Sequence, residues 1–343
     1  MDITMRKRFI VPALFIASLM IAVFIVIFLN FHAYSHAPVT GNEDDRTATV
    51  EIPRGADFSA VTDILEQSGF VTNRTMFYML AFMESAPTEI RAGEYEFTGS
   101  MSPRDILSKM VQGRVKGYRM PIPEGFTVRK IAARLADWRL VDKDRFLQLA
   151  EDETFLTSLS IHGPSIEGYL FPDTYVLTKS MDERAILKFM VRRFRAAVRP
   201  DMIDHGRQLG FSLNEIVTLA SIIEKEGGPP EEKPFIAAVF HNRLKKGMRL
   251  QSDPTVIYGL KSFDGNLTKE DLRKRTPYNT YRIKGLPPGP ICNPGLDSIR
   301  AALNPAPVDS LYFVSKNNGS HYFSSHLDDH IKAVIKYQIK RKR

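Results

Sequence analysis

The sequence predicts an α+β protein with a single N-terminal transmembrane helix, a pair of small α+β modules and a larger α+β domain. Three observations support this prediction: an uncharged apolar run near the N-terminus, an internal repeat, and a change of composition near residue 165. A chain of 343 residues is long enough for two or three domains that each bury a core. Its 43% hydrophobic and 25% charged residues exclude wholesale disorder.

The apolar run covers residues 9–31, which include no formal charge. About 20 such residues suffice to cross the hydrocarbon core of a bilayer. A cleaved signal peptide is the alternative, but its apolar region has only about 7–15 residues and ends at a small-residue cleavage site. Basic residues 6–8 precede the run and acidic residues 43–45 follow it. The positive-inside bias therefore predicts a cytoplasmic tail at 1–8, a transmembrane helix at 9–31, and everything after residue 32 beyond the plasma membrane.

The net charge of +8 suits an anionic partner, but part of it is concentrated at residues 5–8 and 339–343. We predict no nucleic-acid partner, because no recognised binding motif accompanies these charges. Cys292 is the single cysteine, so no internal disulfide is available and the fold must be held by packing.

An internal repeat follows a polar segment at 32–47, which we expect to be a linker. Residues 52–55 (Ile-Pro-Arg-Gly) recur 70 positions later at 122–125 (Ile-Pro-Glu-Gly). Each copy predicts a short strand, a turn with proline and glycine, and an amphipathic helix. Asp57 and Thr127 stand at equivalent helix starts and are predicted N-caps.

Between the copies, residues 93–97 alternate as in a strand, and Ser102 with Pro103 predicts the start of another helix. The region 48–155 therefore reads as two small modules, 48–118 and 119–155. A duplicated small module more often binds or positions than catalyses, and a plain structural spacer is the alternative.

The third part, 156–343, contains loops rich in aromatic, proline, glycine and amide residues. Aromatic faces stack on sugar rings, while amides and carboxylates pair with hydroxyls, so such loops suit a cleft for a hydroxylated ligand. Turn chemistry explains each loop equally well by itself. The loops are 167–175, 250–255, 278–281 and 285–290.

Residues 213–226 predict a helix that ends at Gly227, before two prolines. Its apolar positions recur at helical spacing, which indicates an inward face. At 100° per residue, Glu226 lies roughly 60° from the centre of this face and Glu224 roughly 100°. The apolar positions are Ile216, Leu219, Ala220 and Ile223.

A carboxylate on the inward side of a helix C-terminus is unfavourable, because the helix dipole and apolar neighbours both disfavour its charge. Both effects raise its pKa, as a general acid at neutral pH requires. Glu226 is therefore the candidate catalytic residue. The structural alternative is an ion pair between Glu226 and a base such as Arg243. Glu224 either modulates Glu226 by repulsion or faces solvent.

A metal site is a rival hypothesis, because His326 and His330 are spaced as zinc ligands on a helix and His321 precedes them. No glutamate stands between two histidines in the HExxH arrangement of zinc proteases. We therefore predict neither a metal nor another cofactor.

Several strings occur in one order along the chain and together resemble the YceG-like (MltG) endolytic murein transglycosylases. The resemblance covers nearly the whole chain and implies one N-terminal span, LysM-like modules at 48–155 and a catalytic domain at 156–343. The strings are 167–168 with 171–174, 220–226, 242–243, 248–259, 278–281 and 285–289.

In the family, the last glutamate of the Ile-Ile-Glu-Lys-Glu string is essential, and it matches Glu226. The family usually has a small polar residue directly after it, where this chain has Gly227. The matching strings also supply candidates for binding the hydroxyl and acetamido groups of the substrate. These are Glu224, Asn242, Gln251, Asp253, Tyr278 and Asn279.

The resemblance implies cleavage of the MurNAc–GlcNAc bond of nascent peptidoglycan glycan strands to 1,6-anhydroMurNAc ends, which terminates elongation beside inner-membrane peptidoglycan synthases. One carboxylate suffices when the C6 hydroxyl of the sugar is the nucleophile, since no water has to be activated. A second acid at Asp253 would instead permit hydrolysis. A non-catalytic, membrane-anchored peptidoglycan-binding scaffold is the other alternative.

Overall fold

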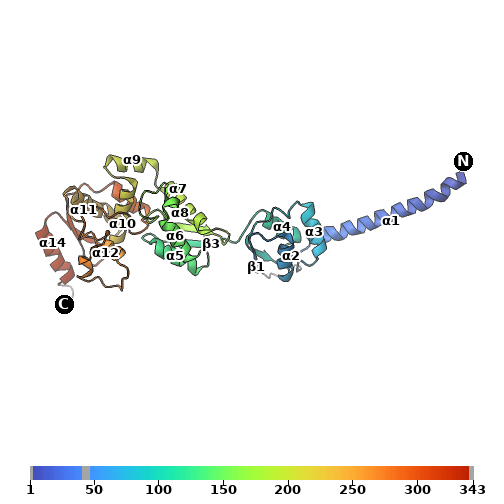
Figure 1. Cartoon of the computed structure of the whole chain (residues 1–343), viewed down its shortest axis with the longest axis horizontal. Helices are drawn as coiled ribbons and strands as arrows, with labels where there is room; N and C mark the ends of the chain where they lie inside the picture. Colours follow the sequence, from blue (N-terminus) through green and yellow to red (C-terminus); the bar gives the residue numbers. More distant parts are fainter. Residues whose placement is uncertain (1–2, 41–46, 340–343) are drawn as a thin grey trace. The chain divides into compact units, whose positions relative to one another are not determined.

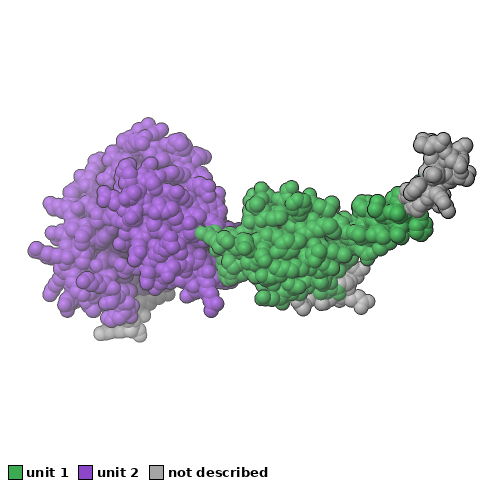
Figure 2. Space-filling view, turned by 45° about the vertical axis from the view of Figure 1, so that its right-hand side comes forward, with its two compact units in different colours: residues 1–118, 178–180 green, residues 119–177, 181–343 purple. Residues whose placement is uncertain are grey.

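The computed structural model describes residues 3–40 and 47–339, with side chains from Leu14 onward. The acidic cluster at 43–45 and the last four basic-tail positions lie outside this part of the chain. Two compact units are present: residues 1–118 with 178–180, and residues 119–177 with 181–343 (Figure 2). Each unit is described by itself.

The first unit begins with one long helix, α1 (Ile3–His36). Its part from Leu14 to His36 is long and apolar enough to cross a membrane. The helix continues past residue 31, so the segment predicted as a linker begins inside it. Phe31 and Ser35 are buried there, Phe31 in the same hydrophobic cluster as Phe77 and Leu80. The last turns of α1 are therefore part of the folded unit.

After α1 the first unit has the order β-α-α-β-α. Strands β1 (Thr47–Ile52) and β2 (Gly93–Thr98) pair antiparallel, and helices α2 (Phe58–Gln67), α3 (Arg74–Met83) and α4 (Pro103–Val111) complete the unit. The predicted caps are confirmed: Asp57 accepts from the amide of Ala60 at 2.8 Å, and Ser102 forms a capping box with Asp105.

The second unit repeats this order with β3 (Tyr118–Ile122), α5 (Val128–Asp137), α6 (Lys143–Glu151), β4 (Asp173–Leu177) and α8 (Glu183–Ala197). Strands β3 and β4 form a two-stranded sheet. An insertion with α7 (Glu153–Ser158) separates α6 from β4.

The second repeat is therefore longer than predicted. It continues through β4 and α8, beyond the predicted end at residue 155. The compact units divide at residue 118, which is also the boundary predicted between the two modules. Buried tyrosines make the correspondence specific: Tyr95 donates its hydroxyl to the carbonyl of Arg91, and Tyr175 donates to that of Phe171, four residues back in both cases.

The rest of the second unit is mainly helical, which completes the predicted α+β class. It comprises α9 (Pro200–Gln208), α10 (Leu213–Glu226), η1 (Pro230–Glu232), α11 (Lys233–Lys245), α12 (Asp253–Gly259), η2 (Asp271–Arg273), α13 (Leu296–Leu303), β5 (Tyr312–Ser315), β6 (His321–Ser324), α14 (Leu327–Val334) and η3 (Ile335–Ile339). Strands β5 and β6 form an antiparallel hairpin.

Helix α10 is the central element of this part, and its predicted bounds are confirmed. A capping box at Ser212 starts it and Gly227, with φ 78°, ends it. Every residue from 216 to 223 is buried, because α9, α11, α12 and α13 all contact this helix (Figure 1). A helix that is apolar on all sides is a core helix, so the inward face is wider than the predicted stripe.

Candidate active site

Glu226 is the last residue of α10, so its position is set by the best-buried helix of the unit. Gly227 has a positive φ, which glycine adopts without steric cost, and this lets the chain turn away directly after the carboxylate. The side chain of Glu226 is partly exposed and faces a pocket of about 360 Å³. A rigid helix thus presents one acid to a solvent-accessible hollow.

The pocket combines aromatic, amide and charged side chains. They come from α10, α11, the loop before α12, the segment after η2, the β5–β6 hairpin and α14. The lining residues are Glu226, Phe240, Arg243, Leu250, Gln251, Asp253, Tyr281, Tyr312, Phe313, Leu327 and His330. Of the predicted site residues, the structure brings Glu226, Gln251 and Asp253 together here.

Ser252 holds the carboxyl of Glu226 by donating its hydroxyl to Oε1 at 2.5 Å. Ser252 is itself fixed, since its amide donates to Oγ1 of Thr280 at 3.0 Å and its carbonyl accepts from Thr255 at 2.6 Å. All three residues are buried. The network fastens the loop at 250–255 to the segment at 278–281, so two separate loops orient one acid.

The pKa of Glu226 is raised from its ordinary value to about 7, chiefly because burial disfavours the charged carboxylate. The negative charge of Asp253 raises it further, while the hydrogen bond from Ser252 and the positive charge of Arg243 lower it. Near neutral pH both the acid and its conjugate base are therefore populated. A group of this kind can give a proton to a substrate and take one back.

Arg243 lies in the pocket without forming the ion pair with Glu226 that the structural alternative required. Its guanidinium donates to the carbonyls of Leu311 and Leu250, both at 2.7 Å, and lies 5.3 Å from the ring centre of Tyr312. These bonds leave Arg243 as a fixed positive charge near Glu226. Sequence reasoning considered Arg243 only as an ion-pair partner and missed this arrangement.

Gln251 adopts a φ of 50°, a left-handed conformation that costs a non-glycine residue roughly 1–2 kcal/mol. Its backbone amide donates to the carbonyl of Thr280 at 3.2 Å, which helps to hold the conformation. Strained residues of this kind collect at functional sites, where the surrounding structure enforces them. The side chain of Gln251 lines the pocket.

Asp253 accepts a hydrogen bond from the hydroxyl of Tyr281 at 2.6 Å. Burial, followed by this bond to Asp253, raises the pKa of Tyr281 above its ordinary value, so the hydroxyl stays protonated. Tyr281 was missed as a site residue. The sequence offered two tyrosines three positions apart, 278 and 281, and nothing local indicated which one reaches the pocket.

Glu224 is turned away from the pocket. Its Oε2 pairs with Lys233 at 3.2 Å and accepts from the amide of Gly295 at 3.2 Å and the hydroxyl of Ser298 at 2.5 Å. Its side chain is only 11% exposed, which contradicts the alternative in which it faces solvent. Glu224 therefore fastens the end of α10 to the start of α13.

Three other candidates also lie outside the pocket lining. The side-chain amide of Asn242 donates to the carbonyls of Val308 and Ser310 at 2.9 and 3.0 Å. Asn279 is fully buried and donates to the carbonyls of Leu272 and Lys274. Tyr278 packs edge-on against Tyr258, with ring centres 4.8 Å apart. All three hold loops in place.

Of the four loops predicted to form a cleft, 250–255 and 278–281 meet at this pocket. Loop 167–175 is largely structural, because Glu167 is buried and Tyr175 belongs to the repeat. Residues 285–288 line a different hollow beside Phe211 and Asn214.

The three histidines of the metal hypothesis do not converge. His321 pairs with Glu232 at 2.7 Å, His326 precedes α14, and His330 stacks on Tyr312 at 5.2 Å in the pocket. Within residues 14–40 and 47–339, no three metal-ligating side chains are grouped. The pKa of His330 is lowered by burial and by Arg243, which keeps the ring neutral.

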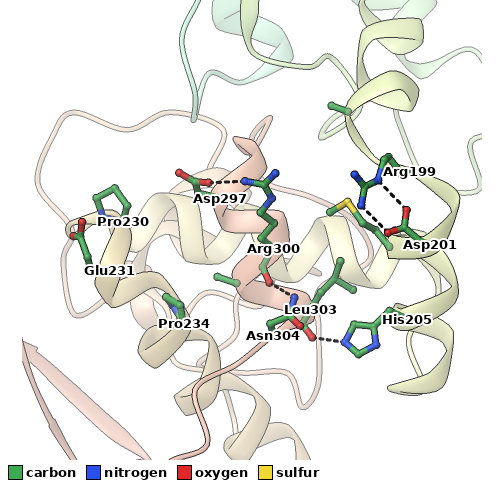
Figure 3. Close-up of a pocket in the computed structure, with 13 residues that line it drawn as sticks. Arg199, Asp201, His205, Pro230, Glu231, Pro234, Asp297, Arg300, Leu303 and Asn304 are labelled. Carbon is green, nitrogen blue, oxygen red and sulfur yellow. Dashed lines mark hydrogen bonds and ion pairs between the residues drawn. The ribbon is translucent and has the colours of Figure 1, made fainter.

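A larger hollow, of about 710 Å³, lies among α9, η1 and α13 (Figure 3). Four of the charged side chains that line it form two ion pairs: Arg199 with Asp201, and Arg300 with Asp297. The ring Nε2–H of His205 donates to the carbonyl of Leu303 at 3.0 Å. No buried acid of raised pKa faces it, so the chemistry points to the smaller pocket at Glu226.

Fold and site together define a class of protein: a duplicated β-α-α-β-α module followed by a helical domain that presents one carboxylate of raised pKa in a polar, aromatic-lined pocket. The chain belongs to the YceG-like family, whose model matches residues 50–336.

Two curated relatives carry the name endolytic murein transglycosylase. The protein of Bacillus subtilis (strain 168) is 33% identical over 309 residues, which cover 85% of each chain. The protein of Streptococcus pneumoniae serotype 2 (strain D39) is 30% identical over 332 residues, which cover 88% of this chain and 60% of that relative. A crystal structure of a YceG-like protein from Listeria monocytogenes is 35% identical, with a TM-score of 0.58, and covers 84% of this chain and 99% of that one.

Proposed function

We propose that this protein is a lytic transglycosylase that cleaves the MurNAc–GlcNAc bond of peptidoglycan and that Glu226 is its catalytic acid and base. The observation that carries the proposal is the carboxyl of Glu226, whose pKa is raised to about 7 at the wall of a solvent-accessible pocket. Family membership and the names of the two relatives agree with this function.

In the proposed reaction, protonated Glu226 donates to the glycosidic oxygen as the bond from C1 of N-acetylmuramic acid breaks. N-acetylglucosamine leaves with a hydroxyl group. The resulting carboxylate takes the proton of the C6 hydroxyl. The oxygen of that hydroxyl bonds to C1, which produces the 1,6-anhydro end. Glu226 is reprotonated, no water is consumed, and intramolecular attack supplies the proximity.

For substrate binding, we propose Gln251, Asp253 and Tyr281, because all three line the Glu226 pocket. Arg243, held by backbone carbonyls, would favour the carboxylate form after proton transfer. Asp253 remains the candidate second acid if the enzyme is a hydrolase, and only the products distinguish these reactions. Four predicted binding residues are reassigned as residues that hold loops and helix ends in place: Glu224, Asn242, Tyr278 and Asn279.

The direct test uses the full-length protein in detergent with uncrosslinked glycan strands, and mass spectrometry of the products. The wild type should produce ends lighter by one water than reducing ends. Glu226→Gln keeps the shape of the side chain but cannot donate the proton, so cleavage should fall by about 10²–10⁴-fold. Glu215→Gln, on the first turn of the same helix, is the matched control and should cleave normally.

Other products would change the conclusion. Reducing ends would establish a hydrolase and make Asp253→Asn the next variant. Strand binding without cleavage by either protein would favour the peptidoglycan-binding scaffold. Products cut from the interior of the glycan strands would establish endolytic cleavage. Products released stepwise from strand ends would establish exolytic cleavage.

For localisation, we propose that α1 anchors the protein in the plasma membrane with its N-terminus in the cytoplasm. The length and apolar character of Leu14–His36 support the anchor, and the basic residues 6–8 support the orientation. The catalytic part would then act outside the membrane beside emerging strands, where peptidoglycan synthases would be its partners.

We further propose that the two β-α-α-β-α modules are LysM-like elements that position the glycan strand. Their duplicated order, with a glycine turn of positive φ at residues 55 and 125, supports a common ancestry. Binding of the isolated glycan to full-length Glu226→Gln, with and without substitutions in the modules, tests this role.

A further inference from the structure

Helix α3 has two different apolar faces. Phe77, Leu80 and Ala81 are fully buried in the cluster that also contains Phe31 of α1. On the opposite side, four large side chains recur at helical spacing and face outward. These are Tyr78 (36% exposed), Met79 (39%), Phe82 (81%) and Met83 (64%), here called the outer face of α3.

An exposed stripe of this kind is unusual for a surface helix, which normally presents polar residues to water. Contiguous apolar patches mark contacts with proteins or membranes. Two features of the first unit favour a membrane. Helix α3 contacts α1 directly, and it lies at the end of the unit from which α1 leaves (Figure 1).

The position of α3 along the length of α1 also favours a membrane contact. Phe28 and Leu29 of α1 are 53% and 58% exposed, whereas Phe31 is buried against α3 and its neighbours. At 1.5 Å rise per residue, the exposed apolar part of α1 therefore ends only about 3–5 Å before α3 begins to cover it. The boundary between lipid and folded protein thus falls at α3.

We propose that the outer face of α3 lies in the headgroup–acyl boundary of the bilayer, so that α1 and α3 hold the first unit against the membrane as a two-point attachment. The inference rests on the proposed anchoring by α1. Aromatic and thioether side chains suit this boundary.

The test places single tryptophans in the full-length protein, reconstituted in nanodiscs with lipids brominated near the top of their acyl chains. Trp138→Phe removes the single natural tryptophan. Phe82→Trp then reports on the outer face, and Ile21→Trp reports on insertion of α1. Glu51→Trp is the control and should not be quenched. Glu51 is exposed and lies near the C-terminal end of β1, whereas α1 precedes the N-terminal end of this strand.

An interfacial helix places its apolar face about 5–10 Å into the boundary, so Phe82→Trp should lose roughly half of its emission to the brominated lipid. Quenching at Ile21 without quenching at Phe82 would overturn the proposal and leave the anchor intact. Blue-shifted but unquenched emission at Phe82 would assign the face to a protein, such as a second copy. No quenching at Ile21 would overturn the anchor and, with it, the lipid contact of α3.

Discussion

Two neighbours of Glu226 act on the pKa of its carboxyl in opposite directions. Ser252 stabilises the carboxylate by a hydrogen bond and lowers the pKa, while the charge of Asp253 raises it. The acid must be protonated to begin the proposed reaction, so kcat/KM should fall as pH rises through about 7.

The two neighbours give a pair of opposite predictions. Ser252→Ala removes the hydrogen bond and should move the falling limb of the pH profile to higher pH. Asp253→Asn removes the negative charge and should move it to lower pH. The measurement is kcat/KM for strand cleavage against pH. Shifts in one common direction would contradict the assignment of Glu226 as the titrating acid.

Tyr281 and Tyr278 provide a second residue-scale test, because only Tyr281 reaches the pocket. A hydrogen bond to a charged group contributes about 1.5–3 kcal/mol, so Tyr281→Phe should lower kcat/KM by roughly tenfold or more. Tyr278→Phe should remain within about twofold of the wild type, since its ring packs on Tyr258. Equal losses in both variants would indicate a general effect on the loop.

At the scale of elements, a buried carboxyl joins the second repeat to the helical domain. Glu167 accepts from the amide of Val128, the first residue of α5, at 3.0 Å and from the side chain of Asn293 at 2.9 Å. Asn293 in turn accepts from the amides of Gly168 and Leu170. Burial raises the pKa of Glu167 to about 8 despite these donors.

This arrangement predicts a pH-dependent stability difference. Glu167→Gln replaces an oxygen that accepts hydrogen bonds, even in the protonated acid, by an NH2 group that accepts none, so it should lower the free energy of unfolding by about 1–3 kcal/mol. A raised pKa in the folded state means that the wild type loses stability as pH rises from about 4.5 to about 8. The difference between wild type and variant should therefore shrink from pH 5 to pH 8.

Urea unfolding of both proteins at these two pH values is the measurement. Asp144→Asn, an exposed acid on α6, is the control and should change neither value. A difference that grows with pH would show that Glu167 is ionised in the folded protein.

At the scale of the whole molecule, the two compact units should unfold in separate transitions, since each has its own core. The duplicated tyrosines assign the transitions. Tyr95→Phe should lower the stability of the first unit and Tyr175→Phe that of the second, each by about 1 kcal/mol. Calorimetry of both variants measures this, and one transition shifted equally by both would contradict two independent units.

The sequence by itself determined the features that depend on neighbours along the chain. The bounds of α10 and its stop at Gly227 were predicted, as were the caps Asp57 and Ser102. Helix caps, glycine stops and helical spacing act over only a few residues, so the local sequence is enough to predict them. The placement of Glu226 on the inward face follows from the same spacing.

Only the tertiary structure decided which partners meet from distant parts of the chain. Glu224 and Glu226 lie within one helical turn. Glu224 nevertheless forms an ion pair with Lys233 and a hydrogen bond with the start of α13, whereas Glu226 accepts a hydrogen bond from Ser252. The full length of the second repeat likewise depends on the pairing of β3 with β4, across an insertion that hides the match. Such contacts depend on how whole elements pack, and no local signal specifies them.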